Sequence, residues 1–450
     1  MRLKRHLALG FASLMALAAP AAAQLPGGIG LPGVGGALPS ALPTGLVPSI
    51  GEPLRPRPLT RRPLEVTGEA ATGLLVGTYE AASRRLLAQH PDVIEPDDRG
   101  QPVVRGEILA LGVDPQALRR LKQAGFGIRG RERLPGLGLE PIVLSAPRGL
   151  STTQAIRRLH ELDPDGQYDF NHLYFESGGV DASTATLGAA TATAALPQRI
   201  GLVDGSVASG RPALRGARLI QRPFAPGGAV ATAHATAVAS LIAEASGGAR
   251  EATLYVADIY GATPSGGSAI ALSRGLAWLA EARVAVINVS LVGPPNLLLA
   301  AAVKALVDRG HLLVAPVGND GPAAPPLYPA AYAGVVAVTG VDRLRHVLPE
   351  AGRGTHVDFA APGADLSAAG LDRDLVTVRG TSFAAPIAAG LLARRLSAPD
   401  PAAAARALAA LGQEAIDLGA PGPDPVFGRG LVGIDARVGP AGPPATSGRK

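Results

Sequence analysis

The chain has 450 residues, of which 47% are hydrophobic but only 4% aromatic, and it contains no cysteine. Disulfides, thiolate catalysis and cysteine-bound zinc are therefore excluded. The formal net charge of +6 does not indicate nucleic-acid binding. Residues 198–437 carry 20 basic and 18 acidic residues and have no basic stripe with interleaved aromatic residues, so no nucleic-acid partner is expected.

The first 23 residues have the three parts of a secretory signal peptide. A basic start (Arg2, Lys4 and Arg5) precedes the apolar run Leu7–Ala19, and the alanines at 21–23 offer a cleavage site. The run is shorter than the ~20 apolar residues that span a bilayer. Residues 1–23 are therefore predicted to be a signal peptide. The product should be secreted, to the cell exterior or the periplasm, with no membrane association after signal removal.

Composition then divides the chain into segments. Residues 24–64 are rich in proline and glycine, which is typical of a linker. Residues 65–176 contain a β-α-β-β-α-β order, typical of a small ferredoxin-like α+β domain. Its expected strands are 105–113, 125–130, 139–145 and 168–175, and its expected helices are 114–124 and 151–162. An Asp-Pro start at Asp114 favours the first helix.

The next 21 residues, 177–197, form an Ala/Thr-rich tract without apolar periodicity, and we expect a flexible linker that a protease can reach. From 198 to 437, short apolar runs alternate with helical patterns. Such alternation predicts a doubly wound, mostly parallel α/β sheet covered on both faces. Expected strands are 199–204, 253–260, 284–290, 312–317 and 335–341, and expected helices are 232–245, 268–282, 297–309, 383–396 and 401–411. Residues 438–450 are predicted to be a disordered tail.

Three residues in this region have the chemistry of a nucleophilic relay. Asp204 ends an apolar strand in IGLVDGS, His234 opens a small-residue helix in TAHATAVAS, and Ser382 lies in RGTSFAAP. A serine hydroxyl needs an imidazole to take its proton, and a carboxylate must hold that imidazole in the right tautomer. Carboxyl ends of parallel strands are where such groups gather.

These stretches resemble the three signature motifs of the subtilisin family of serine proteases, in the family order Asp, His, Ser. A fourth stretch, LVAPVGNDG at 313–321, is similar to the family motif whose asparagine supplies the oxyanion hole. The resemblance covers about residues 199–433. It implies a subtilisin-like catalytic domain at 198–437 in which Asp204, His234 and Ser382 are catalytic. Asn319 and the Ser382 amide would hold the oxyanion.

The resemblance also implies a substrate path. Ser290, Leu291 and Val292 would form the edge strand that pairs with a polypeptide substrate, and Pro316 and Val317 would line the pocket for the residue before the cut. The expected preference is for apolar side chains of modest size. Related enzymes carry a ferredoxin-like prosegment that inhibits them. By this resemblance, autocleavage between Glu176 and Gln198 would separate residues 65–176, which would remain bound as a tight inhibitor.

No cofactor and no metal are expected. Family members often bind calcium in the histidine helix, but residues 240–253 lack the oxygen ligands that Ca²⁺ requires. An esterase is disfavoured because the chain lacks a G-x-S-x-G elbow and has a different triad order. A catalytically weak or inactive subtilase-like binding or chaperone protein is the alternative. A fluorophosphonate probe that fails to label Ser382 would favour that alternative.

Overall fold

The computed structural model describes residues 78–181, 198–248 and 252–433. The predicted signal peptide, the 24–64 linker, the tail and most of the 177–197 tract lie outside this description. Within the described ranges, no helix combines the length and apolarity that a bilayer crossing requires.

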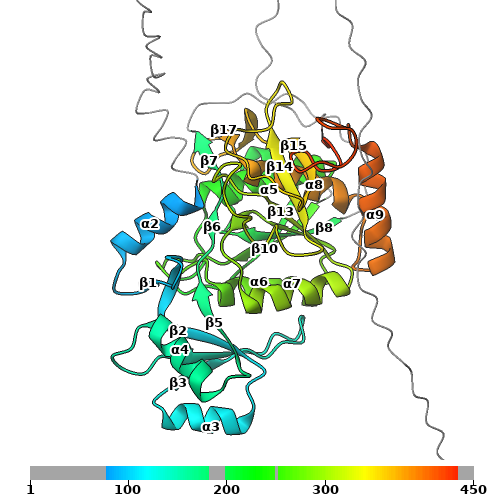
Figure 1. Ribbon diagram of the computed structural model, residues 1–450. Helices are drawn as coiled ribbons and strands as arrows, with labels where there is room; N and C mark the ends of the chain where they lie inside the picture. Colours follow the sequence, from blue (N-terminus) through cyan, green and yellow to red (C-terminus); the bar gives the residue numbers. More distant parts are fainter. Residues whose placement is uncertain (1–77, 182–197, 249–251, 434–450) are drawn as a thin grey trace, which may run out of the picture. The chain divides into compact units, whose positions relative to one another are not determined.

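The larger sheet has seven strands that pair in parallel (Figure 1). Its spatial order is β15-β14-β13-β11-β8-β10-β9. The strands are β8 (Gln198–Asp204), β9 (Arg218–Pro223), β10 (Ala252–Asp258), β11 (Val286–Val289), β13 (Leu312–Pro316), β14 (Val336–Val341) and β15 (Val357–Pro362). The central strands are buried on both faces, as their continuous apolar runs predict.

Helices cover both faces of this sheet. Along β13, Leu312 and Val314 belong to one core, while Leu313 belongs to the other, because successive side chains point to opposite faces. The first core includes α5 (Ala233–Ala245), α8 (Thr381–Ala393) and α9 (Pro401–Glu414). The second includes α6 (Ala269–Glu281) and α7 (Leu297–Asp308). The predicted doubly wound α/β fold class is confirmed.

The order of the strands positions the candidate site. The chain lays β9 and β10 on one side of β8 and then moves to the other side for β11. Ligands of open α/β sheets bind at such a switch point, beyond the carboxyl ends of the strands. Asp204 ends β8, Ser290 follows β11, and Asn319 follows β13 at this edge.

A smaller antiparallel sheet lies in the N-terminal described region. The strands β2 (Pro102–Leu111), β3 (Gly127–Arg131), β4 (Ile142–Ser145) and β5 (Gln167–His172) alternate with α3 (Pro115–Gln123) and α4 (Thr152–Leu162) in the expected β-α-β-β-α-β order. Strand β2 pairs with β4 and β5, and β4 pairs with β3. The resulting spatial order, β5-β2-β4-β3, is that of a ferredoxin-like sheet. Asp114 caps α3 through Gln116 and Ala117, as expected.

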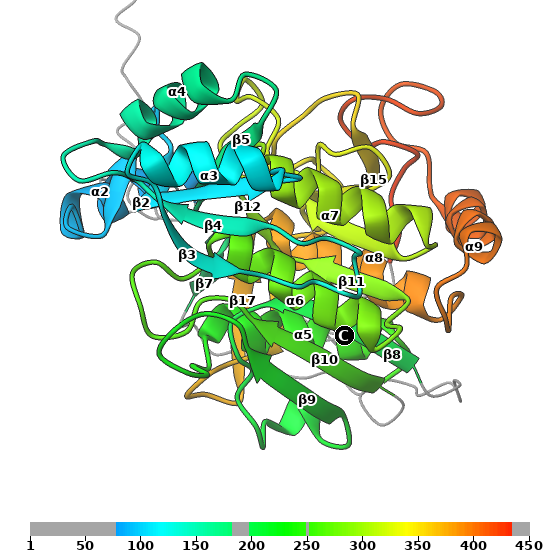
Figure 2. The ribbon, with the colours of Figure 1, turned by 90° about the horizontal axis from the view of Figure 1, so that it is seen from below.

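The two faces of the small sheet have different neighbours. Ile108 and Leu144 pack in a core with α3 and α4. Leu109 and Val143 face the other way and join the core that contains α6 and α7. Figure 2 shows α7 beside the small sheet, with α3 and α4 on its outer side.

Several elements were not expected. Helix α2 (Tyr79–Gln89) precedes the small sheet, and β1 (Ile94–Pro96) pairs antiparallel with β2 as a fifth strand of it. A hairpin of β16 (Leu366–Ala369) and β17 (Leu375–Arg379) precedes α8. The 177–197 tract, which was expected to be a flexible linker, begins with a short strand. Strand β7 (Gly179–Asp181) pairs antiparallel with β17, so the first residues of this tract are ordered by backbone hydrogen bonds that its composition does not reveal.

Candidate active site

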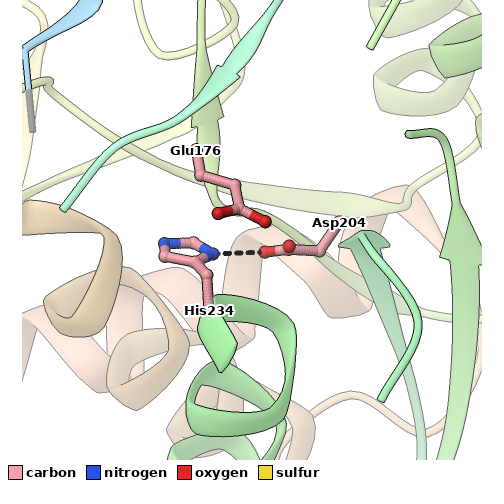
Figure 3. Close-up of side chains that lie close together, drawn as sticks. All are labelled: Glu176, Asp204 and His234. Carbon is pink, nitrogen blue, oxygen red and sulfur yellow. Dashed lines mark hydrogen bonds and ion pairs between the residues drawn. The ribbon is translucent and has the colours of Figure 1, made fainter. Parts of the chain in front are cut away.

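Asp204 and His234 form a buried pair. The Nδ1 atom of His234 lies 2.9 Å from Oδ2 of Asp204, and both side chains are at most 3% exposed (Figure 3). Strand β8 delivers the carboxylate at its end, and α5 delivers the imidazole in its first turn, where the side chain of Thr232 caps the helix. Because the carboxylate accepts, Nδ1 carries the proton, which leaves Nε2 for a nucleophile.

Electrostatics favour the charged form of this imidazole. Burial acts to lower the pKa of His234, but the negative charges of Asp204 and Glu176, with the hydrogen bond to Asp204, raise it to about 9. Two carboxylates therefore act on one imidazole. The second of them, Glu176, was not predicted to lie here.

Ser382 lies in the first turn of α8 and is fully buried. Its Oγ atom and Nε2 of His234 are both buried without a hydrogen-bond partner among the described residues. The ring of the next residue, Phe383, lies 5.1 Å from the His234 ring. Because a helix N-terminus directs N–H groups outward, this turn favours negative charge next to Ser382.

Asn319 links this helix to the chain that crosses the site. Its Oδ1 atom accepts hydrogen bonds from the backbone N–H and the hydroxyl of Thr381, both at 3.1 Å. Its Nδ2 donates to Oγ of Ser177 at 2.9 Å. The first pair of bonds orients the amide, so that its N–H side faces the segment that includes Ser177.

That segment runs through the site as an extended strand. Strand β6 (Phe175–Glu176) pairs antiparallel with β12 (Leu291–Val292), so that Glu176 lies opposite Leu291. After Ser177 and Gly178 the chain pairs again, as β7 with β17, where Gly179 lies opposite Arg379. Ser177 and Gly178 are therefore the residues held between two paired strands at the level of Asn319.

Gly380 makes the close approach of this segment possible. A Cβ on Gly380 would lie 2.8 Å from Cα of Gly178 and 3.1 Å from Nδ2 of Asn319, and its φ of +135° is a conformation that L side chains rarely adopt. Position 380 therefore requires glycine for two reasons, its positive φ and the close approach of the crossing chain.

The other predicted substrate-binding residues have varied positions. Leu291 and Val292 lie in β12, whereas Ser290 precedes it and donates its hydroxyl to the Ser382 carbonyl at 3.0 Å. Pro316 ends β13, and Val317 is buried in the core that contains α6 and α7. Ser290 therefore tethers the backbone of Ser382, a role that the resemblance did not suggest.

The sequence predicted no role for Glu176 in the site, although the small domain was expected to end at this residue. Thr232 donates its hydroxyl to Oε1 of Glu176 at 3.1 Å. One ligand atom from each of Glu176, Asp204 and His234 lies within 4.8 Å of the others, a spacing that a metal ion could also use. The Nδ1 proton of His234 is donated to Asp204, as it would be in a proton relay between these two residues. Asp258, at the end of β10, accepts hydrogen bonds from the Ser206 hydroxyl and from three backbone amides, so its role is structural.

Comparisons with known proteins agree with this geometry. The subtilase family matches residues 228–430, which include His234, Asn319 and Ser382. The minor extracellular protease Epr of Bacillus subtilis is 34% identical over 213 residues, which cover 46% of this chain and 33% of that protein. Subtilisin Savinase of Lederbergia lenta is 35% identical over 167 residues, which cover 36% of this chain and 61% of that protein.

A solved structure extends the similarity of fold. The crystal structure of fervidolysin from Fervidobacterium pennivorans, a keratinolytic enzyme related to subtilisin, matches with a TM-score of 0.62 at 20% identity. The match covers 76% of this chain and 62% of that one. The aligned region spans between about a third and six tenths of the first curated relatives. Residues 228–430 therefore carry a subtilase-family domain, the domain of subtilisin-like serine proteases.

Proposed function

We propose that this chain is a secreted serine endopeptidase that is made with an inhibitory prosegment and removes that prosegment itself. The observation that carries the proposal is the buried Asp204–His234 pair, whose imidazole packs against Phe383, the residue after Ser382, with the chain's own extended segment crossing the same site. Secretion is supported by the signal-like pattern of residues 1–23.

The reaction begins when Nε2 of His234 accepts the hydroxyl proton of Ser382 while Oγ bonds to the peptide carbonyl carbon. The oxyanion that forms accepts hydrogen bonds from Nδ2 of Asn319 and the backbone N–H of Ser382. The C–N bond then breaks, and the imidazolium gives its proton to the leaving nitrogen. Water repeats the sequence on the acyl-enzyme, releases the carboxylic acid and restores the Ser382 hydroxyl.

The bond that the enzyme cuts in its own chain is proposed to be Ser177–Gly178. Strand β6 pairs with β12 up to Glu176, and β7 resumes pairing at Gly179, so this bond lies between the two paired stretches. Asn319 contacts the Ser177 side of it. Ser177 is fully buried, which favours a small side chain before the cut.

Contacts of the small sheet support its role as an inhibitor. Asp169 and Asn171, alternate residues of β5, accept hydrogen bonds from the first-turn amides of α7 and α6, at 2.7 Å from Leu297 and 3.2 Å from Ile270. Each side chain accepts from a backbone N–H group that has no partner within its own helix. Tyr174 is fully buried, and its hydroxyl donates to the Pro294 carbonyl at 2.9 Å. These bonds would survive cleavage and keep the released prosegment in place.

Labelling with a fluorophosphonate probe tests the activity itself. Processed protein should react at Ser382, and the His234→Ala variant should lose this labelling because its serine has no base. Failure of the processed protein to react would support a subtilase-like binding protein instead.

A further inference from the structure

We propose that Glu176 is an autoinhibitory residue whose carboxylate keeps His234 protonated and thereby delays cleavage of the bond after Ser177. Glu176 occupies the position two residues before the proposed Gly178 amine, which is the P2 position of a substrate. The inference rests on the proposed protease function. It adds a consequence for substrates, because any peptide with an acidic P2 residue would meet the same imidazole.

The geometry brings the carboxylate to the base. Pairing of β6 with β12 sets Glu176 opposite Leu291, and Figure 3 shows its side chain directed to the His234 ring. The ligand atoms of Glu176, Asp204 and His234 all lie within 4.8 Å of one another. The bond from the Thr232 hydroxyl, 3.1 Å long, holds Oε1 of Glu176 at the start of the same helix that carries His234.

The groups around Glu176 leave His234 as its cationic partner. Asp204 faces it from β8, and Tyr260, whose buried hydroxyl has no partner among the described residues, faces it from the loop after β10. Burial, with the charges of Glu176, Asp204 and Asp258, raises the pKa of Tyr260 well above its ordinary value, so this phenol is neutral. Of the described groups that act on the Glu176 charge, only His234 can be positive.

The charges then set the protonation state. Loss of contact with water raises the pKa of Glu176, His234 lowers it and Asp204 raises it again, with the result at about 7. The pKa of His234 is raised to about 9. Between these two values the carboxylate is ionised and the imidazole is protonated. An imidazolium cannot accept the Ser382 proton, so only the small neutral fraction of His234 supports cleavage.

Dissociation of the cleaved prosegment would end this inhibition. When the prosegment dissociates, Glu176 leaves with it, and His234 keeps Asp204 as its one carboxylate partner in the relay. The free enzyme should therefore have its base in the neutral form at lower pH than the uncleaved chain does. Self-processing would be slow and mature activity fast at the same neutral pH.

A pair of peptides tests the effect in the mature enzyme without changing the protein. Peptides that contain Tyr-Phe-Glu-Ser-Gly-Gly or Tyr-Phe-Gln-Ser-Gly-Gly differ only in the P2 charge. The acid limb of kcat reports the enzyme–substrate complex and should lie about one pH unit or more higher for the Glu peptide. The acid limb of kcat/KM reports the free enzyme and should be the same. Coincident kcat limbs would overturn the inference, whereas failure to cleave either peptide would contradict the proposed protease.

The full-length chain provides the second test. Glu176→Gln should speed cleavage of the prosegment from the chain at pH 7 by about ten-fold, since one pH unit in the base corresponds to that factor. The advantage should disappear above about pH 9.5. Glu176→Asp keeps the charge and should stay closer to the parent. Glu161→Gln, at an exposed ion pair with Arg158, is the matched control and should leave the profile unchanged. Equal rates for Glu176→Gln and the parent at pH 7 would refute autoinhibition.

Discussion

The side-chain amide of Asn319 donates a hydrogen bond of 2.9 Å to the hydroxyl of Ser177, 142 residues earlier in the chain. Asn319 is the proposed oxyanion donor, and Ser177 is the residue before the proposed cut. The contact therefore joins the proposed oxyanion donor to the proposed cleavage site within one molecule. Both flanking stretches of that substrate are held by strand pairing, with β12 before the bond and β17 after it.

Removal of the nucleophile or the base should abolish catalysis. Ser382→Ala and His234→Ala are each expected to reduce kcat on a peptide by about 10⁶-fold, the loss found for the equivalent changes in subtilisin. Turnover of a chromogenic peptide by processed enzyme measures this. Near-normal kcat in either variant would exclude the relay.

Loss of the oxyanion donor should be smaller. Asn319→Ala should lower kcat by about 10²–10³-fold with little change in KM, because the amide bonds a charge that exists only in the transition state. Asn319 also accepts from Thr381, so the melting temperature must be measured in parallel. A large rise in KM with unchanged kcat would show that Asn319 acts in ground-state binding.

Glycine at 380 should be indispensable. In Gly380→Ala the new Cβ would meet the crossing chain at Gly178, and a φ of +135° would cost of order 1–3 kcal/mol in the folded state. We expect a lower free energy of unfolding and slower self-processing. The open position Gly210, whose Cβ would meet no atom within 4 Å, is a control for alanine at a positive φ. Equal processing by the two variants would remove the argument for a steric role.

The Tyr174 hydroxyl should determine how tightly the cleaved prosegment stays bound. In Tyr174→Phe the carbonyl of Pro294 loses its donor in a buried place, which costs about 1–3 kcal/mol. The lag before activity appears after cleavage should shorten, since the complex dissociates about ten-fold faster or more. Glu161→Gln, at the surface, should leave the lag unchanged. An unaltered lag in Tyr174→Phe would show that this hydroxyl does not hold the prosegment.

Removal of calcium should have little effect on stability. Helix α5 continues to Ala245 with Glu244 as its one acidic residue, and nothing in it offers the 6–8 oxygens that Ca²⁺ takes. Excess chelator is expected to leave the melting temperature of the mature enzyme unchanged. A decrease of many degrees would identify a calcium site elsewhere.

Periodicity was sufficient to predict the five inner strands of the larger sheet, but not the two edge strands, β9 and β15. Its inner strands are continuous apolar runs because helices cover both faces. Strand β9 was not predicted because it lies at the edge of the sheet. Its residues Arg218, Gln221 and Arg222 are exposed there, so the strand is not a continuous apolar run. Strand β7 escaped because its order comes from pairing with β17, a partner almost 200 residues away.

In the candidate site, too, local motifs predicted some residues, whereas a residue placed by tertiary pairing was missed. Asp204, His234 and Ser382 could be proposed from short motifs, because each motif carries its own chemistry and the strand ends meet at one edge. Glu176 could not be found in this way. Its position beside His234 depends on the register between β6 and β12, and that register is a tertiary property that no local pattern encodes.

The chain is proposed to cut itself with Ser382 at the Ser177–Gly178 bond. The most direct measurement is the intact mass and N-terminal sequence of purified parent and Ser382→Ala proteins, prepared without added protease. We predict a mature parent that begins at Gly178 and a Ser382→Ala protein in which the prosegment remains covalently attached. Processing of Ser382→Ala at the same bond would contradict self-cleavage, and a parent cut at a different bond would contradict the assigned position.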